Sequence, residues 1–201
     1  MKTLTGNEHF TFDGMPVNKL LLDFWAWNQS YLLSDGIRGE LAEFIVATAL
    51  GITDEAPRSS WGDYDLLLDG EFRIEVKSAA YLQAWDVYDG TRLPVRKREG
   101  FSKIVFDIKP VRASGYSRSD DVDIRRHSEA YVFCLYACKN AEEANPLVLD
   151  GWQFYVLPTA RIDALCGEQK RISLGSLLKL DPYFCKFDSL NEAVRKAVYT
   201  V

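Results

Sequence analysis

The sequence predicts one mixed α/β domain with helices flanking a central mixed β-sheet, and three observations support this fold class. Helical patterns come first, strand patterns follow, and helical patterns return at the end, an order typical of mixed α/β or α+β domains. A chain of 201 residues with 47% hydrophobic residues can bury one substantial core. No internal repeat or low-complexity segment divides it. We therefore expect a single domain over residues 1–201, with its core at about 36–138 and a C-terminal strand and helices at 150–201.

Two helices are expected early in the chain, at residues 18–33 and 37–50. Apolar residues recur in both at helical spacing, and Gly51 follows the second helix as a typical terminator. The second helix is apolar almost all round, yet Glu43 lies among its apolar positions. An acid surrounded in this way needs a reason, which makes Glu43 a candidate site residue.

The remaining elements are first strands and then helices. A strong turn signal, Asp69-Gly70, separates the first two strands, and Ser173 and then Asp188 or Ser189 are typical residues at helix starts. We expect strands at 64–69, 72–78, 102–108, 130–138 and 152–157, and helices at 79–86, 159–166, 173–180 and 188–199.

Charge is distributed unevenly along the chain. The 24 Lys and Arg are outnumbered by 29 Asp and Glu, and a net charge of −5 argues against a protein that coats nucleic acid indiscriminately. Residues 92–126 nevertheless contain ten basic and five acidic residues. This segment is either a solvated basic loop or a surface that grips phosphates. Its candidate nucleic-acid contacts are Arg96, Lys97, Arg98, Arg125 and Arg126, and the neighbouring His127 is expected to be exposed.

The composition favours a soluble, cytoplasmic protein. The first residues contain no apolar run flanked by basic residues, and no stretch of about 18 apolar residues occurs that would span a bilayer. The four cysteines form no CxxC pair. We therefore expect free thiols rather than a disulfide or zinc site. From the lack of a long apolar stretch we expect no membrane association.

The residues with the clearest chemistry lie in WGDYDLLLDGEFRIEVKSAAYLQAW, at 61–85. Because side chains alternate along a strand, Glu75 and Lys77 point to one face and Val76 to the other. Phosphodiester hydrolysis needs a divalent cation held by carboxylate oxygens and a positive charge that steadies the developing anion. Asp65, Glu75 and Lys77 supply that set.

The hairpin loop between the two strands decides whether these side chains meet. A strict two-residue loop would set Asp65 opposite Ile74 and facing away from Glu75. A three-residue loop, or one bulge, would set Asp65 directly across from Glu75. A nuclease site therefore requires this odd register.

This stretch resembles the PD-(D/E)XK nuclease superfamily, which has the restriction-endonuclease-like fold. The resemblance rests on an acidic helix with GELAE, a strand with YDLLL, the IEVKS that follows it, and Gln83 six residues beyond the lysine. It extends over about residues 36–108 and implies the αβββαβ core of that fold, followed here by C-terminal helices.

The resemblance implies a role for each motif residue. Asp65 and Glu75 would bind Mg²⁺ or Mn²⁺, with the backbone carbonyl of Val76 as a further ligand. Lys77 would orient or deprotonate the attacking water and stabilise charge on the phosphate.

Further residues would complete such a site. Glu43 corresponds to the helix glutamate that many members add to the metal site, and Glu40 is the alternative, although Glu40 suits an exposed position at the helix start. Gln83 would line the site as in exonuclease-like members. Ser78 would contact a phosphate, unless its hydroxyl is bonded to backbone.

Two positions depart from the family pattern. Val87 stands where exonuclease-like members have a tyrosine, which argues against a specifically exonuclease assignment. No proline precedes the motif acid, and Asp63 is left as a second candidate acid.

The function expected from these residues is hydrolysis of DNA by a Mg²⁺- or Mn²⁺-dependent nuclease, in restriction, repair or defence. One alternative is a non-catalytic module that keeps the fold for nucleic-acid binding or assembly. A weaker alternative is a nuclease acting on RNA or branched DNA. We also expect a homodimer, because endonucleases of this fold often pair to cut two strands.

Overall fold

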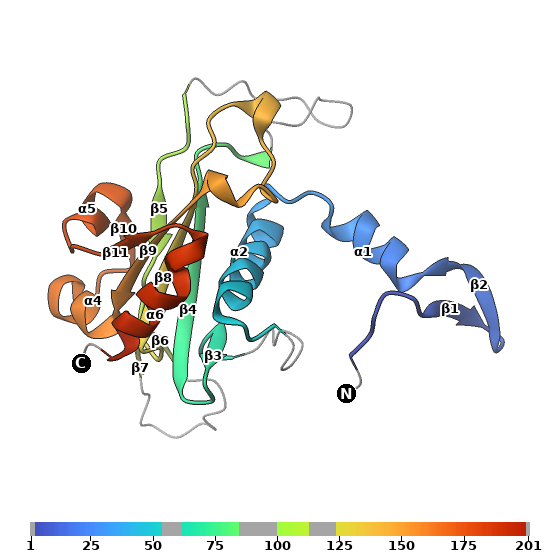
Figure 1. The fold of residues 1–201 in the computed structure, drawn as a ribbon, viewed down its shortest axis with the longest axis horizontal. Coiled ribbons are helices and arrows are strands. Elements are labelled where there is room, and N and C mark those ends of the chain that lie inside the picture. The colour runs from blue at the N-terminus through green and yellow to red at the C-terminus, as the bar shows by residue number, and fades with distance from the viewer. Residues whose placement is uncertain (1–2, 54–61, 85–99, 113–123, 200–201) are drawn as a thin grey trace.

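A computed structural model describes residues 3–53, 62–84, 100–112 and 124–199. It contains a central β-sheet with helices packed against both faces, and an N-terminal segment that extends away from this body (Figure 1). The predicted mixed α/β class is therefore confirmed. None of the helices in the described ranges is long and apolar enough to cross a bilayer.

The central sheet has five strands in the order β11-β9-β8-β4-β3. They are β3 (Leu66–Leu68), β4 (Phe72–Ala80), β8 (Ala130–Tyr136), β9 (Trp152–Pro158) and β11 (Tyr183–Cys185). The β4–β8 pair is parallel and the other neighbouring pairs are antiparallel, so the sheet is mixed as predicted. The first four of these strands lie within two residues of their predicted bounds, whereas β11 was not predicted.

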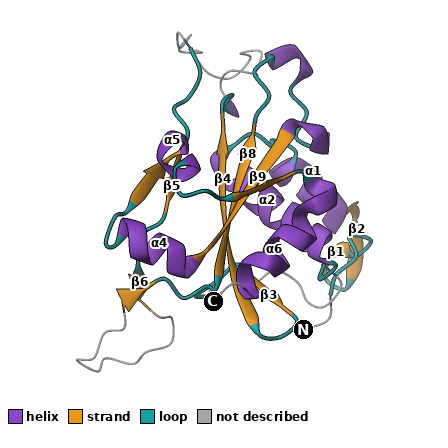
Figure 2. Cartoon of the chain, turned by 60° about the vertical axis from the view of Figure 1, so that its left-hand side comes forward, coloured by secondary structure: helices purple, strands orange, loops and turns teal. Residues whose placement is uncertain are grey.

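Different elements cover the two faces of this sheet. The helices α2 (Asp35–Leu50) and α6 (Leu190–Tyr199) cover one face. The other face is covered by α4 (Thr159–Cys166), α5 (Leu174–Leu178) and a small antiparallel sheet of β5 (Val105–Asp107) and β10 (Arg171–Ser173) (Figure 2). The sheet is thus the middle layer of the body.

Helix ends in the body follow the capping signals in the sequence. Gly51 closes α2 with a φ of 75°, a left-handed conformation that glycine adopts without a steric penalty. Ser173 opens α5, and its hydroxyl oxygen accepts the backbone N–H of Ser176. The helix predicted at 159–166 is present in full as α4, and a 3₁₀ turn at Phe187–Ser189 precedes α6.

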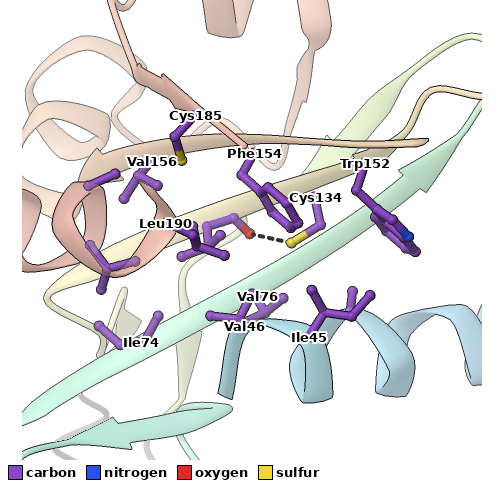
Figure 3. Packing of buried hydrophobic residues seen from close by; sticks show 14 of the residues in the cluster. Ile45, Val46, Ile74, Val76, Cys134, Trp152, Phe154, Val156, Cys185 and Leu190 are labelled. Carbon is purple, nitrogen blue, oxygen red and sulfur yellow. Dashed lines mark hydrogen bonds between the residues drawn. The ribbon is translucent and has the colours of Figure 1, made fainter. Parts of the chain in front are cut away.

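The main core lies between the sheet and the pair α2 and α6. Alternation along β4 brings Ile74 and Val76 into this layer, where Ile45 and Val46 of α2 pack near them and Phe154 packs beyond (Figure 3). A second apolar cluster lies on the opposite face and includes Phe106, Phe133, Leu157, Ile162 and Ile172. The odd-numbered residues of β4 therefore point toward the β5 side of the sheet.

The N-terminal segment differs from the sequence prediction. Residues at the start of the helix expected at 18–33 belong to a hairpin of β1 (His9–Phe12) and β2 (Met15–Leu20), and α1 spans only Leu21–Gln29. The hairpin turns at Asp13-Gly14, where both residues have positive φ, a conformation that suits a two-residue hairpin loop. The backbone N–H of Leu20 donates to the Asp23 carboxylate at 2.8 Å, which helps start the helix at this point.

Other corrections concern short elements. β4 continues to Ala80 where a helix over 79–86 was predicted, and the rest of that prediction reaches residues outside the described ranges. Short strands and 3₁₀ turns, which carry little periodicity, were also missed, namely β6 (Val111–Arg112), β7 (Ile124–Arg125), β10, and the turns at Ala141–Glu143 and Leu149–Gly151. The four cysteines are free thiols, as predicted.

Candidate active site

The β3–β4 hairpin has the odd register that a nuclease site requires. Leu66 pairs with Ile74 and Leu68 with Phe72, which leaves a three-residue loop at 69–71. The loop is closed by the backbone N–H of Glu71, which donates to the carbonyl of Leu68 at 3.1 Å. Continued by one residue, this register would set position 65 across from position 75. In the structure Asp65 lies just beyond the paired residues and bonds to Ile74 and Val76, the residues on either side of Glu75. Of the two alternatives, the three-residue loop is the one present.

Asp65 is fixed at the end of β3 by two backbone contacts to β4. Its N–H donates to the carbonyl of Ile74 at 3.1 Å, and its carboxylate Oδ2 accepts the N–H of Val76 at 2.7 Å. Burial raises the pKa of Asp65 to about 6, and the negative charges of Glu75 and Glu43 add to that rise. The Asp65 carboxylate is therefore near enough to both glutamates to be destabilised by them.

Glu75 and Lys77 form an ion pair on the β5 side of β4. The Lys77 Nζ lies 2.5 Å from Glu75 Oε1, and the two side chains are 27% and 19% exposed, respectively. Burial lowers the pKa of Lys77, but the nearby carboxylates of Glu75 and Asp65 outweigh this effect and raise it overall. Lys77 is therefore a cation at neutral pH. The Ser128 hydroxyl donates to the second Glu75 oxygen at 3.4 Å.

A cavity of about 220 Å³ opens at this ion pair. Its lining joins strand β4 to residues from the neighbouring loops and strands, namely Asp63, Glu75, Lys77, Asp107, Lys109, Val111, His127 and Tyr131. Tyr131 lies here because it pairs with Glu75 in the parallel β4–β8 register. The sequence reasoning missed Asp107, Lys109 and Tyr131, which come to the cavity from segments distant in the chain.

His127 also belongs to this lining, contrary to expectation. It is 4% exposed, not solvated in a basic loop, and its Nε2 lies 3.0 Å from the carbonyl of Val111. This contact with backbone explains how a polar ring is accommodated next to the cavity.

Burial distinguishes the two candidate helix acids. Glu43 is 8% exposed and its charge contributes to the raised pKa of Asp65, whereas Glu40 is exposed on α2. Glu43 is therefore the acid that α2 directs toward Asp65. Within the described ranges, however, no group of three or more Asp, Glu, His or Cys side chains is arranged to hold a metal ion.

Ser78 and Gln83 lie on the α2 side of β4, away from the cavity. Both are bound by Arg38, a buried residue of α2 whose Nε lies 3.3 Å from Ser78 Oγ and whose Nη1 lies 3.1 Å from Gln83 Oε1. Arg38 also contacts the Leu33 carbonyl and the Asp35 carboxylate. The prediction that Ser78 and Gln83 face nucleic acid is therefore corrected, because their polar atoms serve an internal network. Arg38, the one basic residue within the apolar sequence of α2, was the signal in the sequence for this buried network.

The predicted basic contacts divide into three cases. Arg126 is 6% exposed, and its guanidinium binds the carbonyls of Ile108 and Gly167 and the Asp163 carboxylate. The prediction that Arg126 contacts nucleic acid is corrected for this reason. Arg125 is exposed on β7. Arg96, Lys97 and Arg98 lie outside the described ranges.

The geometry brings the motif residues Asp65, Glu75 and Lys77 to one place, with Glu43 behind them and a cavity beside them. Carboxylate oxygens and an adjacent ammonium group suit the binding of a hard cation and of an anionic substrate. Comparison of the chain with family models, with curated proteins and with solved structures finds no match.

Proposed function

We propose that this protein is a Mg²⁺- or Mn²⁺-dependent nuclease that hydrolyses phosphodiester bonds in DNA, in a restriction, repair or defence role. The observation that carries the proposal is the three-residue hairpin loop, whose register brings Asp65 to the end of β3 beside Val76 and near the Glu75 charge, while Lys77 shares the face of Glu75. An even loop would have separated the two acids. A functional site needs this register. Charges that merely alternate along a solvated strand would not need it.

The donor set suits a hard divalent cation. Asp65 and Glu75 offer carboxylate oxygens and the Val76 carbonyl a neutral oxygen, and Mg²⁺ and Mn²⁺ prefer oxygen ligands. The raised pKa of Asp65 reports a local excess of negative charge, to which Glu75 and Glu43 contribute and which a cation would relieve. A bound cation would polarise the phosphate and lower the pKa of a water molecule.

The remaining residues of the cavity act on substrate. Lys77, protonated and held by Glu75, would transfer its contact to a phosphate oxygen once substrate enters. Lys109 supplies a second ammonium group in the cavity lining. Ser128 donates to Glu75 and keeps that carboxylate oriented.

A second candidate function is a non-catalytic nucleic-acid-binding module. Two observations favour it. No three-carboxylate group is arranged for a metal among the described residues, and Lys77 already compensates the charge of Glu75. In such a module Lys77 and Lys109 would bind phosphates without hydrolysis.

One assay separates the two functions. The protein is incubated with plasmid, linear duplex and single-stranded DNA in Mg²⁺, in Mn²⁺ and in EDTA, with RNA and branched DNA as further substrates. The nuclease predicts cleavage that EDTA abolishes and that falls at least about 100-fold in Glu75→Gln and in Lys77→Ala. Glu71→Gln is the matched control, because Glu71 is exposed in the loop of the same hairpin and should retain full activity. DNA binding without cleavage under every metal condition would establish the module instead.

A further inference from the structure

The N-terminal arm, defined as residues 3–30, is a separate unit made of β1, β2 and α1. It extends from the body beyond α2 (Figure 1). Its own backbone holds it together, because the N–H groups of Leu21 and Leu22 donate to the carbonyls of Glu8 and Gly6. Gly6 packs closely on the Trp25 ring, where an added Cβ would lie 3.0 Å from a ring carbon. The arm is therefore a preformed element.

The arm exposes an unusual number of apolar side chains. α1 contains no buried residue, and all four residues of β1 are exposed. Phe12, Met15 and Trp27 are 74%, 69% and 82% exposed, and Phe10, Val17, Leu22 and Phe24 are exposed as well. Isolated two-stranded hairpins are marginal in water unless an apolar face is covered. Large exposed apolar patches mark interaction sites.

We propose that the N-terminal arm is a dimerisation element that pairs with the same arm of a second copy of this chain along the edge of β1. A fully exposed aromatic side chain offers about 150–250 Å², so the exposed apolar side chains of one arm present roughly 1,000 Å², against about 800 Å² per partner in a stable interface. One arm therefore offers enough apolar surface for a stable dimer.

Charge argues against a nucleic acid or an anionic membrane as the partner of the arm. Its charged side chains are Glu8, Asp13 and Asp23 against Lys19, so the excess is acidic. Phosphate surfaces attract basic segments and repel acidic ones. The partner that fits the arm is therefore a protein surface that is apolar and has an unpaired strand edge.

The two edges of the hairpin point to self-pairing through β1. β2 carries Pro16 and Lys19, two devices that block strand addition at an edge, whereas β1 has neither. Phe12 pairs with Met15 next to the turn and Thr11 pairs with Pro16, which has no N–H to donate. Thr11 therefore directs its own N–H and carbonyl outward from β1. A second β1 can meet this edge antiparallel about a two-fold axis, which closes the dimer.

The test is the oligomeric state of the full chain, measured by sedimentation velocity from about 1 to 100 µM without DNA or metal. The wild type is expected to be a dimer. Phe12→Glu, which places a charge on the apolar face, and Thr11→Pro, which removes the outward donor, should each weaken dimerisation at least about 100-fold. Leu165→Glu is the control, because Leu165 is also an exposed apolar residue and lies on α4, outside the arm.

Three outcomes would overturn the proposal: a monomeric wild type at 100 µM, dimerisation that persists unchanged in both arm variants, or equal weakening in the Leu165 control. A monomeric wild type would point to a different protein as the occupant of the arm. Far-UV circular dichroism and the Tm of each variant distinguish lost pairing from lost folding, since an exposed side chain contributes little to the stability of the monomer. The measurement does not depend on nuclease activity.

Discussion

The two faces of β4 differ in polarity: one is apolar and buried in the core, and the other carries charged side chains at a cavity. Ile74 and Val76, on the α2 side, are 0% and 6% exposed in an apolar core. Glu75 and Lys77 point the other way, into a cavity lined by charged and polar groups. Both sets of side chains stand on the same strand between β3 and β8, so the two faces differ in their side chains and in the elements that cover them.

The difference teaches that the α2 face supports stability through apolar burial, whereas the acid next to the Glu75–Lys77 pair, Asp65, opposes it. Apolar burial stabilises the fold by about 25 cal/mol per Å² removed from water. A raised pKa means that the charged form of a carboxyl group is less stable in the folded state than in the unfolded chain. This is the case for Asp65. Residues kept at such a cost are candidates for function, and each prediction below tests this contrast.

The largest expected effect on stability comes from the α2 face. Ile74→Ala should lower the free energy of unfolding by about 3–4 kcal/mol, because it opens a cavity in a fully buried layer. Glu75→Gln, one position along and isosteric, removes the ion pair with Lys77 but also the repulsion with Asp65, and should change it by less than about 1 kcal/mol. Urea unfolding of the two variants measures both values. Equal losses would mean that the cavity face is as much a part of the core as the α2 face.

A smaller effect is expected at Arg38, the polar exception on the α2 face. Arg38→Met keeps the aliphatic stem but leaves Gln83 Oε1 and the Leu33 carbonyl without their donor, which should cost about 2–3 kcal/mol of stability. Arg125→Met, at an exposed position, should cost less than about 0.5 kcal/mol. Urea unfolding with a DNA-binding assay checks the interpretation. Loss of DNA binding without loss of stability in Arg38→Met would show that the network faces substrate after all.

The same contrast explains how much could be predicted from the sequence. Core strands and α4 were predicted within about two residues because periodicity and capping are local signals. Strand alternation placed Glu75 and Lys77 on one face, whereas the turn signal left the register open and only the nuclease hypothesis required the odd loop that is present. Tyr131 was missed because it reaches the cavity through the β4–β8 pairing, which periodicity does not encode, and Lys109 because it lies in a segment distant in the chain from the motif. The start of the helix predicted at 18–33 is strand in the structure. Apolar spacing indicates a helix only where one face is buried, and the apolar residues of the arm are exposed.

The pH dependence of stability should reveal the cost of Asp65, roughly 2 kcal/mol between pH 4 and pH 7.5. The pKa of Asp65 is about 6 in the fold and 3.8 as its reference, so between these values the folded state binds more protons than the unfolded chain. Stability from this group is therefore present below about pH 4 and lost as pH rises through 6, at about 1.4 kcal/mol per pKa unit. The difference in unfolding free energy between wild type and Asp65→Asn, measured without metal from pH 4 to 7.5, isolates this effect. A difference that stays constant with pH would contradict it.

The smallest expected effect is stabilisation by the cation itself. If Asp65 and Glu75 hold Mg²⁺, a concentration ten times the dissociation constant adds about 1.4 kcal/mol, which raises the Tm of a domain of this size by about 3–6 °C. The gain should be larger at pH 7.5 than at pH 5, where protonation of Asp65 competes with the metal. Asp65→Asn and Glu75→Gln should abolish the gain, and Ile74→Ala, although far less stable, should retain it. Thermal scans with Mg²⁺ and with matched ionic strength from NaCl measure this. A gain that survives in both acid variants would locate the cation elsewhere and remove the link between the cavity face and metal.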